Sequence, residues 1–309
     1  MHLFAGSSHL KLAQALAKEL KIDLGTITLK AFSNGERYVR FLESVRGKDV
    51  YLLQTGTLKP NEDLLELFLI CQAAKLSFAR TVHVIMPHFP YARQDRVAAP
   101  REPISAKLVA HLLEESGADH LITMHLHSDQ IQGFFSIPVD VLDARPIFAD
   151  YLLKKKLKDF LIVAPDIGSA KDAKKFADLV GAELAILHKT RPEHHKAEIL
   201  EVVGNVKGKT CVIIDDMIDT ASTLSAARSE LIKQGAHKDV YAMATHAIFS
   251  GPALERLKKA KFKEIVVSDS LPVKYHAVPG LTILPIAPML ARVIGQVERG
   301  ESVTAIYHR

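Results

Sequence analysis

Acidic and hydroxyl side chains follow a short apolar run in the second half of the chain. Cys211–Ile214 is rich in β-branched residues and predicts a strand buried on both faces. Asp215 and Asp216 stand where this run stops, hydroxyl-bearing residues follow, and a helical pattern begins at Leu224. The unpaired N–H groups at the start of such a helix bind phosphate, whereas carboxylates suit Mg²⁺ or sugar hydroxyls. An Asp-Asp pair alone is more often a solvated turn, but the whole stretch favours a site that holds a phosphorylated sugar at both ends.

A second group of charged residues occupies a long connection. A strand is predicted at Val82–Met86 and the next helix near Ile104–Ser116. Roughly fifteen connecting residues remain, whereas most connections have about 4–6. Arg93, Arg96 and Arg101 lie in this loop. Guanidinium groups match polyphosphate oxygens, so we interpret the loop as a binding segment.

Two histidines follow the strand predicted at Leu121–Met124. In an extended chain His125 and His127 lie on one face, so both could reach one cation. Histidines with ordinary hydrogen bonds are an equally good explanation. Two more polar loops follow strands further along, at Pro165–Lys171 and Lys189–Lys196.

These loops need a framework of alternating strands and helices. The apolar pattern predicts strands near residues 2–5, 27–32, 38–41, 49–54, 160–164, 184–187, 239–244, 264–267, 281–284 and 302–307, besides those above. Helices are expected near residues 9–20, 61–76, 146–156, 171–180, 221–234 and 287–298, and an Asn-Gly turn at residues 33–36. This order predicts α/β domains with ligands beyond the strand C-termini. We place one domain at residues 1–143 and another at 144–309, and the final roughly 20 residues are candidates for packing back on the first domain.

Composition limits the function. Lys and Arg total 40 against 35 Asp and Glu, and the chain has no Trp and no basic–aromatic interleaving, which argues against a nucleic-acid partner. The most apolar stretch, Leu64–Leu76, is too short to cross a bilayer, so no membrane partner is expected. Cys71 and Cys211 lie in apolar runs, which is typical of core thiols in a reducing compartment. We therefore expect a cytoplasmic protein.

Six segments together resemble the ribose-phosphate pyrophosphokinase family, whose domains have the type I phosphoribosyltransferase fold. They follow the family's order, and the resemblance runs from near residue 3 to the C-terminus. The segments are Phe32–Glu36, Glu43–Gly47, Tyr91–Arg96, Pro103–Lys107, Gln130–Phe135 and Asp215–Thr223. The resemblance implies two similar phosphoribosyltransferase-like domains, each with a mainly parallel central sheet flanked by helices.

The resemblance also implies an activity. Such enzymes transfer the diphosphoryl group of Mg-ATP to the C1 hydroxyl of ribose 5-phosphate, giving phosphoribosyl pyrophosphate and AMP. They are typically homo-oligomers, dimers assembling to a hexamer, with an ATP site shared between chains. In this sequence the ATP site would comprise Phe32, Asn34, Gly35 and Glu36 of one subunit and Arg93, Gln94, Asp95 and Arg96 of its neighbour.

The same matching implies roles for residues elsewhere in the chain. His127 and Asp166 match the positions associated with the nucleotide's Mg²⁺, and Asp166–Lys171 matches the pyrophosphate loop. Lys189 and Arg191 match a catalytic flexible loop that could close over the phosphates. Ribose 5-phosphate would be bound by Asp215, Asp216, Asp219, Thr220, Ala221, Ser222 and Thr223, and a regulatory phosphate by Ser44, Arg46 and Arg101.

Five residues depart from the family's pattern. His125 stands where Asp is usual, Ser169 and Ser222 replace glycines of the phosphate loops, Asp172 stands where Arg is common, and Phe78 where the phosphate-activated class often has Ser. We expect Ser222 to keep an ordinary backbone conformation. A non-catalytic regulatory homologue that assembles with an active synthetase is the alternative to an active enzyme. A phosphoribosyltransferase is a third reading, but it leaves the ATP-site segments without a purpose.

Overall fold

The chain forms two compact units in the computed structural model, which describes residues 1–190, 199–274 and 278–304. Unit 1 comprises Met1–Asp143, Ser270–Pro272 and the described residues from Pro285 onward. Unit 2 comprises the described residues of Ala144–Asp269 and Val273–Leu284. The chain therefore leaves unit 1 after Asp143, builds most of unit 2, contributes Ser270–Pro272 to unit 1, completes unit 2, and returns to unit 1 from Pro285. We still propose two domains, at residues 1–143 and 144–309. In this proposal the last roughly 20 residues of the second domain pack on the first.

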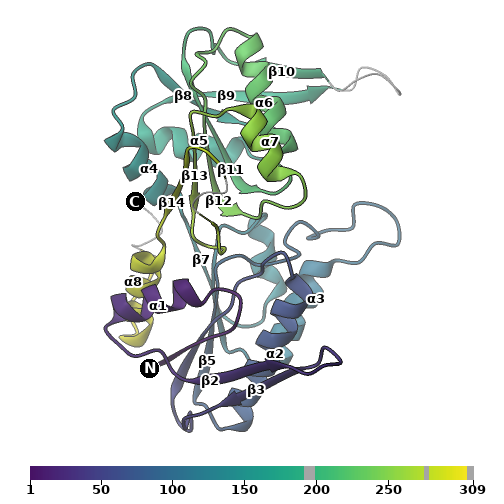
Figure 1. Ribbon diagram of the computed structural model, residues 1–309, viewed down its shortest axis with the longest axis vertical. Coiled ribbons are helices and arrows are strands. Elements are labelled where there is room, and N and C mark those ends of the chain that lie inside the picture. The colour runs from purple at the N-terminus through teal and green to yellow at the C-terminus, as the bar shows by residue number, and fades with distance from the viewer. Residues whose placement is uncertain (191–198, 275–277, 305–309) are drawn as a thin grey trace. The chain divides into compact units, whose positions relative to one another are not determined.

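Unit 1 is built on a parallel sheet with the strand order β1-β4-β5-β6-β7. The strands are β1 (His2–Ala5), β4 (Asp49–Leu53), β5 (Thr81–Met86), β6 (His120–Met124) and β7 (Val139–Leu142). The helices are α1 (Leu10–Leu20), α2 (Pro60–Leu76), α3 (Ser105–Glu115) and α8 (Ala287–Glu298), with a 3-10 helix η1 at Asp129–Phe134. One apolar core joins α2 and α3 to one face of this sheet. Helices α1 and α8 pack on each other, although they come from opposite ends of the chain (Figure 1).

An antiparallel hairpin forms a separate two-stranded sheet in unit 1. Its strands are β2 (Ile27–Ala31) and β3 (Arg37–Phe41), and the hairpin packs against α2. The turn falls on the predicted Asn-Gly pair, and Gly35 has φ +91°, a conformation that glycine adopts without strain. The predicted Asn-Gly turn is therefore confirmed.

Unit 2 contains a larger sheet with the strand order β10-β9-β8-β11-β12-β13-β14. Its strands are β8 (Phe160–Ala164), β9 (Glu183–Thr190), β10 (Ile199–Val203), β11 (Thr210–Ile218), β12 (Tyr241–Ala247), β13 (Glu264–Ser268) and β14 (Leu281–Leu284). All pairs are parallel except β9 with β10. The helices are α4 (Arg145–Lys154), α5 (Ala170–Val180), α6 (Ser222–Lys233) and α7 (Ala253–Ala260), of which α6 and α7 share a core with the sheet.

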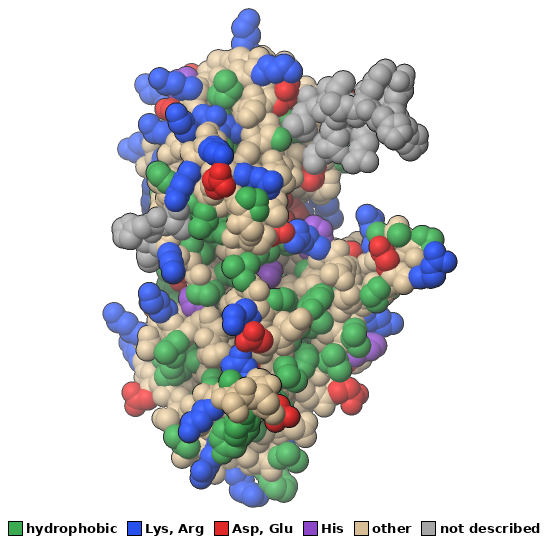
Figure 2. Space-filling view, turned by 45° about the vertical axis from the view of Figure 1, so that its right-hand side comes forward, with side chains coloured by type: hydrophobic (Ala, Val, Ile, Leu, Met, Phe, Trp, Pro, Cys, Tyr) green, Lys and Arg blue, Asp and Glu red, His purple; other side chains and the backbone are tan. Residues whose placement is uncertain are grey.

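The expected fold class is confirmed, with differences in detail. Strands β7 and β10 and helix α7 were not expected from the sequence. The strand expected at 302–307 is wrong for Ser302–Thr304, which lie in no strand, and its remainder lies outside the described residues. Both cysteines are buried and unpaired, as expected. Among the described residues, no helix is long and apolar enough to span a membrane. On the face shown in Figure 2, Lys and Arg side chains are interspersed with acidic ones.

Candidate active site

Strand β11 carries both aspartates of the central motif inside the strand. The expectation that the strand stops at Ile214 is wrong, because β12 is long enough to pair with β11 as far as Ile218. Asp215 lies opposite Ala244 of β12, and the Asp216 N–H donates to Asp215 Oδ1 at 2.9 Å. The two carboxylates lie close enough to interact, because Asp216 contributes to the raised pKa of Asp215.

Asp215 lies in a strongly acidic environment. Burial raises its pKa well above the ordinary value, and the carboxylates of Asp216 and Asp166 raise it further. Asp166 follows the neighbouring strand β8, so the parallel strands bring the two acidic segments to the same edge of the sheet. Such a group favours a bound proton, a cation or hydroxyl donors. This environment suits the sugar hydroxyls and the metal predicted from the sequence.

The turn between β11 and α6 has one strained residue. Ala221, not Ser222, adopts a left-handed conformation, with φ +58°. Ser222 is the first residue of α6 and has ordinary helical geometry, as expected. A methyl group cannot cap a helix, so Ala221 leaves the first N–H groups of α6 to a ligand. The Thr220 and Ser222 hydroxyl oxygens lie 3.1 Å apart beside them. The turn therefore has the geometry of an anion site.

Two residues missed by the sequence reasoning support this turn. The Ser250 N–H donates to the Asp219 carbonyl at 3.1 Å, and its hydroxyl donates to the Asp219 carboxylate. The Arg256 guanidinium donates to the Thr220 carbonyl at 3.0 Å. The signal in the sequence was Gly251-Pro252, which marks a loop after β12 beside the turn.

The segment between β8 and α5 forms a second polar turn. The Ser169 N–H donates to Asp166 Oδ1 at 2.9 Å, and the Ser169 hydroxyl donates to the Asp166 carbonyl at 3.0 Å. Ser169 has φ −82°, so this turn does not require glycine at that position. Asp172, the apparent charge reversal, pairs with Arg145 Nη1 at 3.0 Å and Lys175 Nζ at 3.4 Å. Its negative charge is thus balanced within unit 2.

The tip of the β2–β3 hairpin presents an aromatic ring. Phe32 is 54% exposed, and the Tyr38 ring meets it edge-on, with the centroids 6.0 Å apart. The tip is closed by hydrogen bonds from the Phe32 N–H to the Glu36 carbonyl at 2.8 Å and from the Glu36 N–H to Asn34 Oδ1 at 3.2 Å. An exposed ring beside polar groups suits stacking on a purine base.

The long connection between β5 and α3 has no helix or strand, as predicted. Its Gln94 N–H donates to the Tyr91 carbonyl at 2.9 Å, and the Gln94 carbonyl accepts from Ala106 at 3.1 Å. Arg93 and Arg96 are exposed. The loop is therefore tied to the start of α3 while its guanidinium groups face outward.

The histidine pair does not have the expected geometry. Strand β6 ends at Met124, and His125 has φ +39°, so the chain is not extended there. The premise that His125 and His127 share a strand face is wrong, because the His125 N–H turns to the Leu142 carbonyl at 3.0 Å. His125 is partly buried and His127 is exposed. Within residues 1–190, 199–274 and 278–304, no group of three or more His, Cys, Asp or Glu side chains could hold a metal.

Of the two residues expected on a catalytic flexible loop, Lys189 and Arg191, the structure describes only Lys189. Lys189 was expected in a loop, but its backbone lies in β9 and pairs with Leu200 of β10. The expectation is wrong for Lys189, because β10 extends β9 into a hairpin arm. Arg191 lies outside the described residues.

The segment matched to a regulatory phosphate shows a cation–π contact. The Arg46 guanidinium carbon lies 4.3 Å from the centroid of the Phe78 ring. Phe78 has φ +62°, and its carbonyl accepts from the Gly47 N–H at 2.8 Å. Ser44 is exposed, and Arg101 has φ +74°. The Arg46 guanidinium group therefore contacts the ring of Phe78, the residue that stands where the phosphate-activated class often has Ser.

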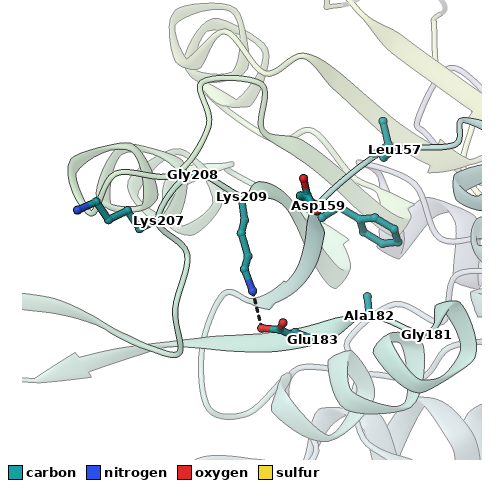
Figure 3. Close-up of a pocket in the computed structure, with 9 residues that line it drawn as sticks. Leu157, Asp159, Gly181, Ala182, Glu183, Lys207, Gly208 and Lys209 are labelled. Carbon is teal, nitrogen blue, oxygen red and sulfur yellow. Dashed lines mark hydrogen bonds and ion pairs between the residues drawn. The ribbon is translucent and has the colours of Figure 1, made fainter.

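A cavity of about 520 Å³ lies elsewhere in unit 2 (Figure 3). Its lining includes Phe160, Glu183 and Lys209, and the Lys209 ammonium lies 2.6 Å from Glu183 Oε2. These residues stand at or just before the first residues of β8, β9 and β11, whereas the polar turns described above follow the carboxyl ends of strands. Ligands of parallel sheets bind beyond the carboxyl ends, so this cavity is separate from the candidate site.

Both units are similar to known proteins. Residues 1–117 match the N-terminal domain of ribose phosphate pyrophosphokinase, and residues 191–308 match the phosphoribosyl synthetase-associated domain. The chain is 44% identical over 308 residues to a ribose-phosphate pyrophosphokinase of Bacillus caldolyticus, covering 99% of this chain and 98% of that protein. A Helicobacter hepaticus ribose-phosphate pyrophosphokinase is 44% identical over 305 residues, with coverage of 99% and 98%. A crystal structure of phosphoribosylpyrophosphate synthetase from Mycobacterium smegmatis matches with a TM-score of 0.92 and 44% identity, covering 97% of this chain and 99% of that one.

Proposed function

The chain belongs to the ribose-phosphate pyrophosphokinase family, and from this premise we propose that it transfers the diphosphoryl group of ATP to the C1 hydroxyl of ribose 5-phosphate. The products are phosphoribosyl pyrophosphate and AMP. The observation that carries this proposal is the extent of the similarity, which covers 99% of the chain and so includes both the hairpin of unit 1 and the β11–α6 turn of unit 2. A phosphoribosyltransferase has no use for an ATP-binding hairpin, so the diphosphokinase explains more of the chain.

Unit 2 supplies the proposed ribose 5-phosphate site. The phosphate lies at the N-terminus of α6, where the N–H groups after Ala221 and the hydroxyls of Thr220, Ser222 and Thr223 donate to it. Asp215 and Asp216 accept hydrogen bonds from the ribose hydroxyls.

Unit 1 supplies the proposed ATP site through the hairpin and the arginine loop. Phe32 stacks on the base, Asn34, Gly35 and Glu36 contact the nucleotide from the tip, and Arg93 to Arg96 pair with it from the loop of a neighbouring subunit. Transfer then depends on in-line alignment and on neutralising the charge that develops on the phosphates. Lys189 and Arg191 provide that positive charge.

We propose Mg²⁺ as the metal of this ATP-using enzyme, and the residues fit it. Asp166 and Asp216 place enough negative charge near Asp215 to raise its pKa. Mg²⁺ usually takes one or two carboxylates together with substrate phosphates, and Asp166 and Asp216 supply carboxylates near Asp215. The family resemblance assigns His127 and, separately, Asp166 to the ion of the nucleotide, and Asp215 and Asp216 to a second ion. When bound, Mg²⁺ would neutralise charge on the diphosphoryl group.

The proposed shared ATP site requires a homo-oligomer, dimers assembling to a hexamer. If Phe32 and Glu36 complete a neighbour's pocket, dilution to monomers should abolish ATP binding. Calorimetry on a forced monomer that still bound ATP normally would exclude a shared site. We also propose a cytoplasmic location, which the two buried, unpaired thiols support.

Formation of AMP from Mg-ATP, measured with and without ribose 5-phosphate, tests the function. We expect AMP to form only when ribose 5-phosphate is present. A silent protein that changed the rate of an active synthetase would instead support the regulatory homologue. The structure accommodates the departures that favoured that alternative, because Asp172 is paired with cations and both Ser169 and Ser222 have φ values open to any residue.

A further inference from the structure

The nucleotide-binding hairpin of unit 1 belongs to neither large sheet, so its tip needs an attachment of its own. The inner face of the hairpin packs on the core through Ile27, Leu29, Val39 and Phe41. This apolar contact stops short of the tip, where Phe32 is 54% exposed. Apolar packing therefore fixes the base of the hairpin but not the residues proposed to bind ATP.

Arg37 makes the attachment nearest the tip. Burial alternates along β3, so Arg37 lies on the same inner face as Val39, whereas Tyr38 and Arg40 are exposed. Arg37 Nη2 donates to Glu62 Oε2 at 2.6 Å, and its Nη1 lies 3.5 Å from Glu66 Oε2. The two glutamates are four residues apart on α2, so one guanidinium spans one helical turn.

Glu66 is a firm anchor because it is buried and held from the other side. Its side chain is 1% exposed, and Oε1 accepts from the Ser7 N–H at 2.7 Å and from Gln54 Nε2 at 3.0 Å. Oε2 has no hydrogen-bond donor among the described residues, so the Arg37 charge is what compensates it. Removing the cation from a buried carboxylate strongly lowers the stability of the folded protein. The pair therefore holds more firmly than an exposed salt bridge would.

The position of Arg37 in the hairpin lets its ion pairs with α2 restrain the turn. It pairs across the hairpin with Ala31, the residue before Phe32, and it directly follows Glu36. The hydrogen bond from the Phe32 N–H to the Glu36 carbonyl then closes the turn above it. We infer that Arg37 is a positioning residue that fixes the nucleotide-binding tip to α2 through Glu62 and Glu66. This inference rests on the proposed function of the tip.

Steady-state kinetics test this role in the full-length protein. Arg37→Gln should raise the KM for ATP at least about fivefold, with kcat changed less and the KM for ribose 5-phosphate unchanged, because only the ATP-binding tip is displaced. Arg37→Lys should restore part of the ATP affinity, since it keeps the charge but loses the planar fork. Arg40→Gln is the matched control, an exposed arginine on the same strand. In a Glu66→Gln background the effect of Arg37→Gln should shrink, because the partner charge is gone.

A fluorescence measurement separates positioning from direct ATP contact and does not depend on catalysis. The chain has no Trp, so Phe32→Trp introduces a single reporter at the tip. Adding Arg37→Gln should lower the fluorescence anisotropy of this introduced indole without ligand, whereas adding Arg40→Gln should not. Equal anisotropy in both variants overturns the inference, as does an unchanged KM for ATP. If the wild type forms no AMP, the proposed function fails, and the anisotropy alone decides whether Arg37 orders the tip.

Discussion

One residue with an unusual backbone angle, Ala221, lies in the turn between β11 and α6 that is proposed to bind phosphate. Ala221 adopts a left-handed conformation at the N-terminus of α6, where a methyl group is strained and glycine is not. The strain persists because Arg256 and Ser250 hold the carbonyls of the two preceding residues. The turn is therefore formed before a ligand arrives, and the neighbouring serine needs no special conformation.

Glycine substitutions at two adjacent positions should have opposite effects. Ala221→Gly should raise the free energy of unfolding by up to about 1 kcal/mol, because it removes the left-handed strain. Ser222→Gly should lower it by about 0.5–1 kcal/mol, because glycine weakens a helix. Denaturant titrations measure both. Ser222→Gly should also change ribose 5-phosphate affinity less than about tenfold, or roughly 1.4 kcal/mol. A silent wild type that gains activity through Ser222→Gly would show that the native turn is obstructed.

A row of polar rings crosses the sheet of unit 1. The Tyr51 and His83 rings are stacked, with centroids 4.4 Å apart, and His83 Nδ1 lies 3.0 Å from His120 Nδ1. His120 Nε2 lies 3.1 Å from Asp140 Oδ2. Burial, assisted by His120, lowers the pKa of His83 to about 4, despite the opposing effect of Asp49. His83 therefore remains neutral in the folded state at neutral pH.

This shift predicts a loss of stability in mild acid. The folded-state pKa of about 4 lies below the unfolded value of 6.5, so the contribution is fully present above pH 6.5 and is lost as the pH falls toward 4. The loss should amount to roughly 1–3 kcal/mol. Thermal unfolding from pH 7 to 4 should show a shallower decline for His83→Asn than for the wild type. The exposed His111, changed to Asn, is the control and should follow the wild type.

Among the elements, the β9–β10 hairpin arm carries a residue proposed for catalysis. Lys189 lies near the end of β9 and pairs with Leu200 of β10, so strand pairing fixes its backbone. Arg191 follows two residues later in the sequence. A cation supplied from such an arm can act on the transition state without holding the sugar in the ground state.

Removal of that charge should affect turnover alone. Lys189→Ala should reduce kcat by at least about 10²-fold and leave the KM for ribose 5-phosphate nearly unchanged, because the charge acts on the transition state. Lys209→Ala, in the same unit but near the amino end of β11, is the control and should keep full activity. The rates of AMP formation by the wild type, Lys189→Ala and Lys209→Ala test this prediction. Equal activity in Lys189→Ala would remove this residue from the mechanism.

The sequence predicted elements better than their ends. The apolar pattern located β11, but Asp215 to Met217 lacked that pattern, and only pairing with β12 shows that the strand continues. The short β10 was missed because its pairing with β9 is tertiary information. The extended geometry assumed for His125 failed because its left-handed angle is imposed by the bond to Leu142. The partner of Asp172 could not be predicted either, since Arg145 lies on a different helix.

On the scale of the whole molecule, unit 1 depends on the end of the chain. Helix α8 buries Met289, Leu290, Val293 and Ile294, and the Tyr51 hydroxyl donates to Glu298 Oε1 at 3.0 Å. The Thr55 hydroxyl donates to the Ser270 carbonyl at 2.9 Å, which ties a second late segment to unit 1. Residues 1–143 therefore do not contain the complete core of unit 1.

Truncation after Leu284 should unfold unit 1. Each of the four buried side chains contributes about 1.5–3 kcal/mol, so their loss is comparable with the roughly 5–15 kcal/mol that stabilises a domain. Hydrogen exchange should show lost protection in β4 and β5 and retained protection in β11 and β12. A chain ending at Arg299 keeps α8 and should remain folded. Equal protection of β4 and β5 in both truncated chains would contradict the prediction.

The return of the chain to unit 1 also sets an order of events on the ribosome. Roughly 150 residues separate Asp143 from the end of α8, and their synthesis at ~5–20 residues per second takes roughly 8–30 s. During that interval the nascent first unit exposes the apolar side of α1 that α8 will cover. Unit 2, although translated later, has all its strands once Leu284 emerges. The half of the protein made first is thus the half that matures last.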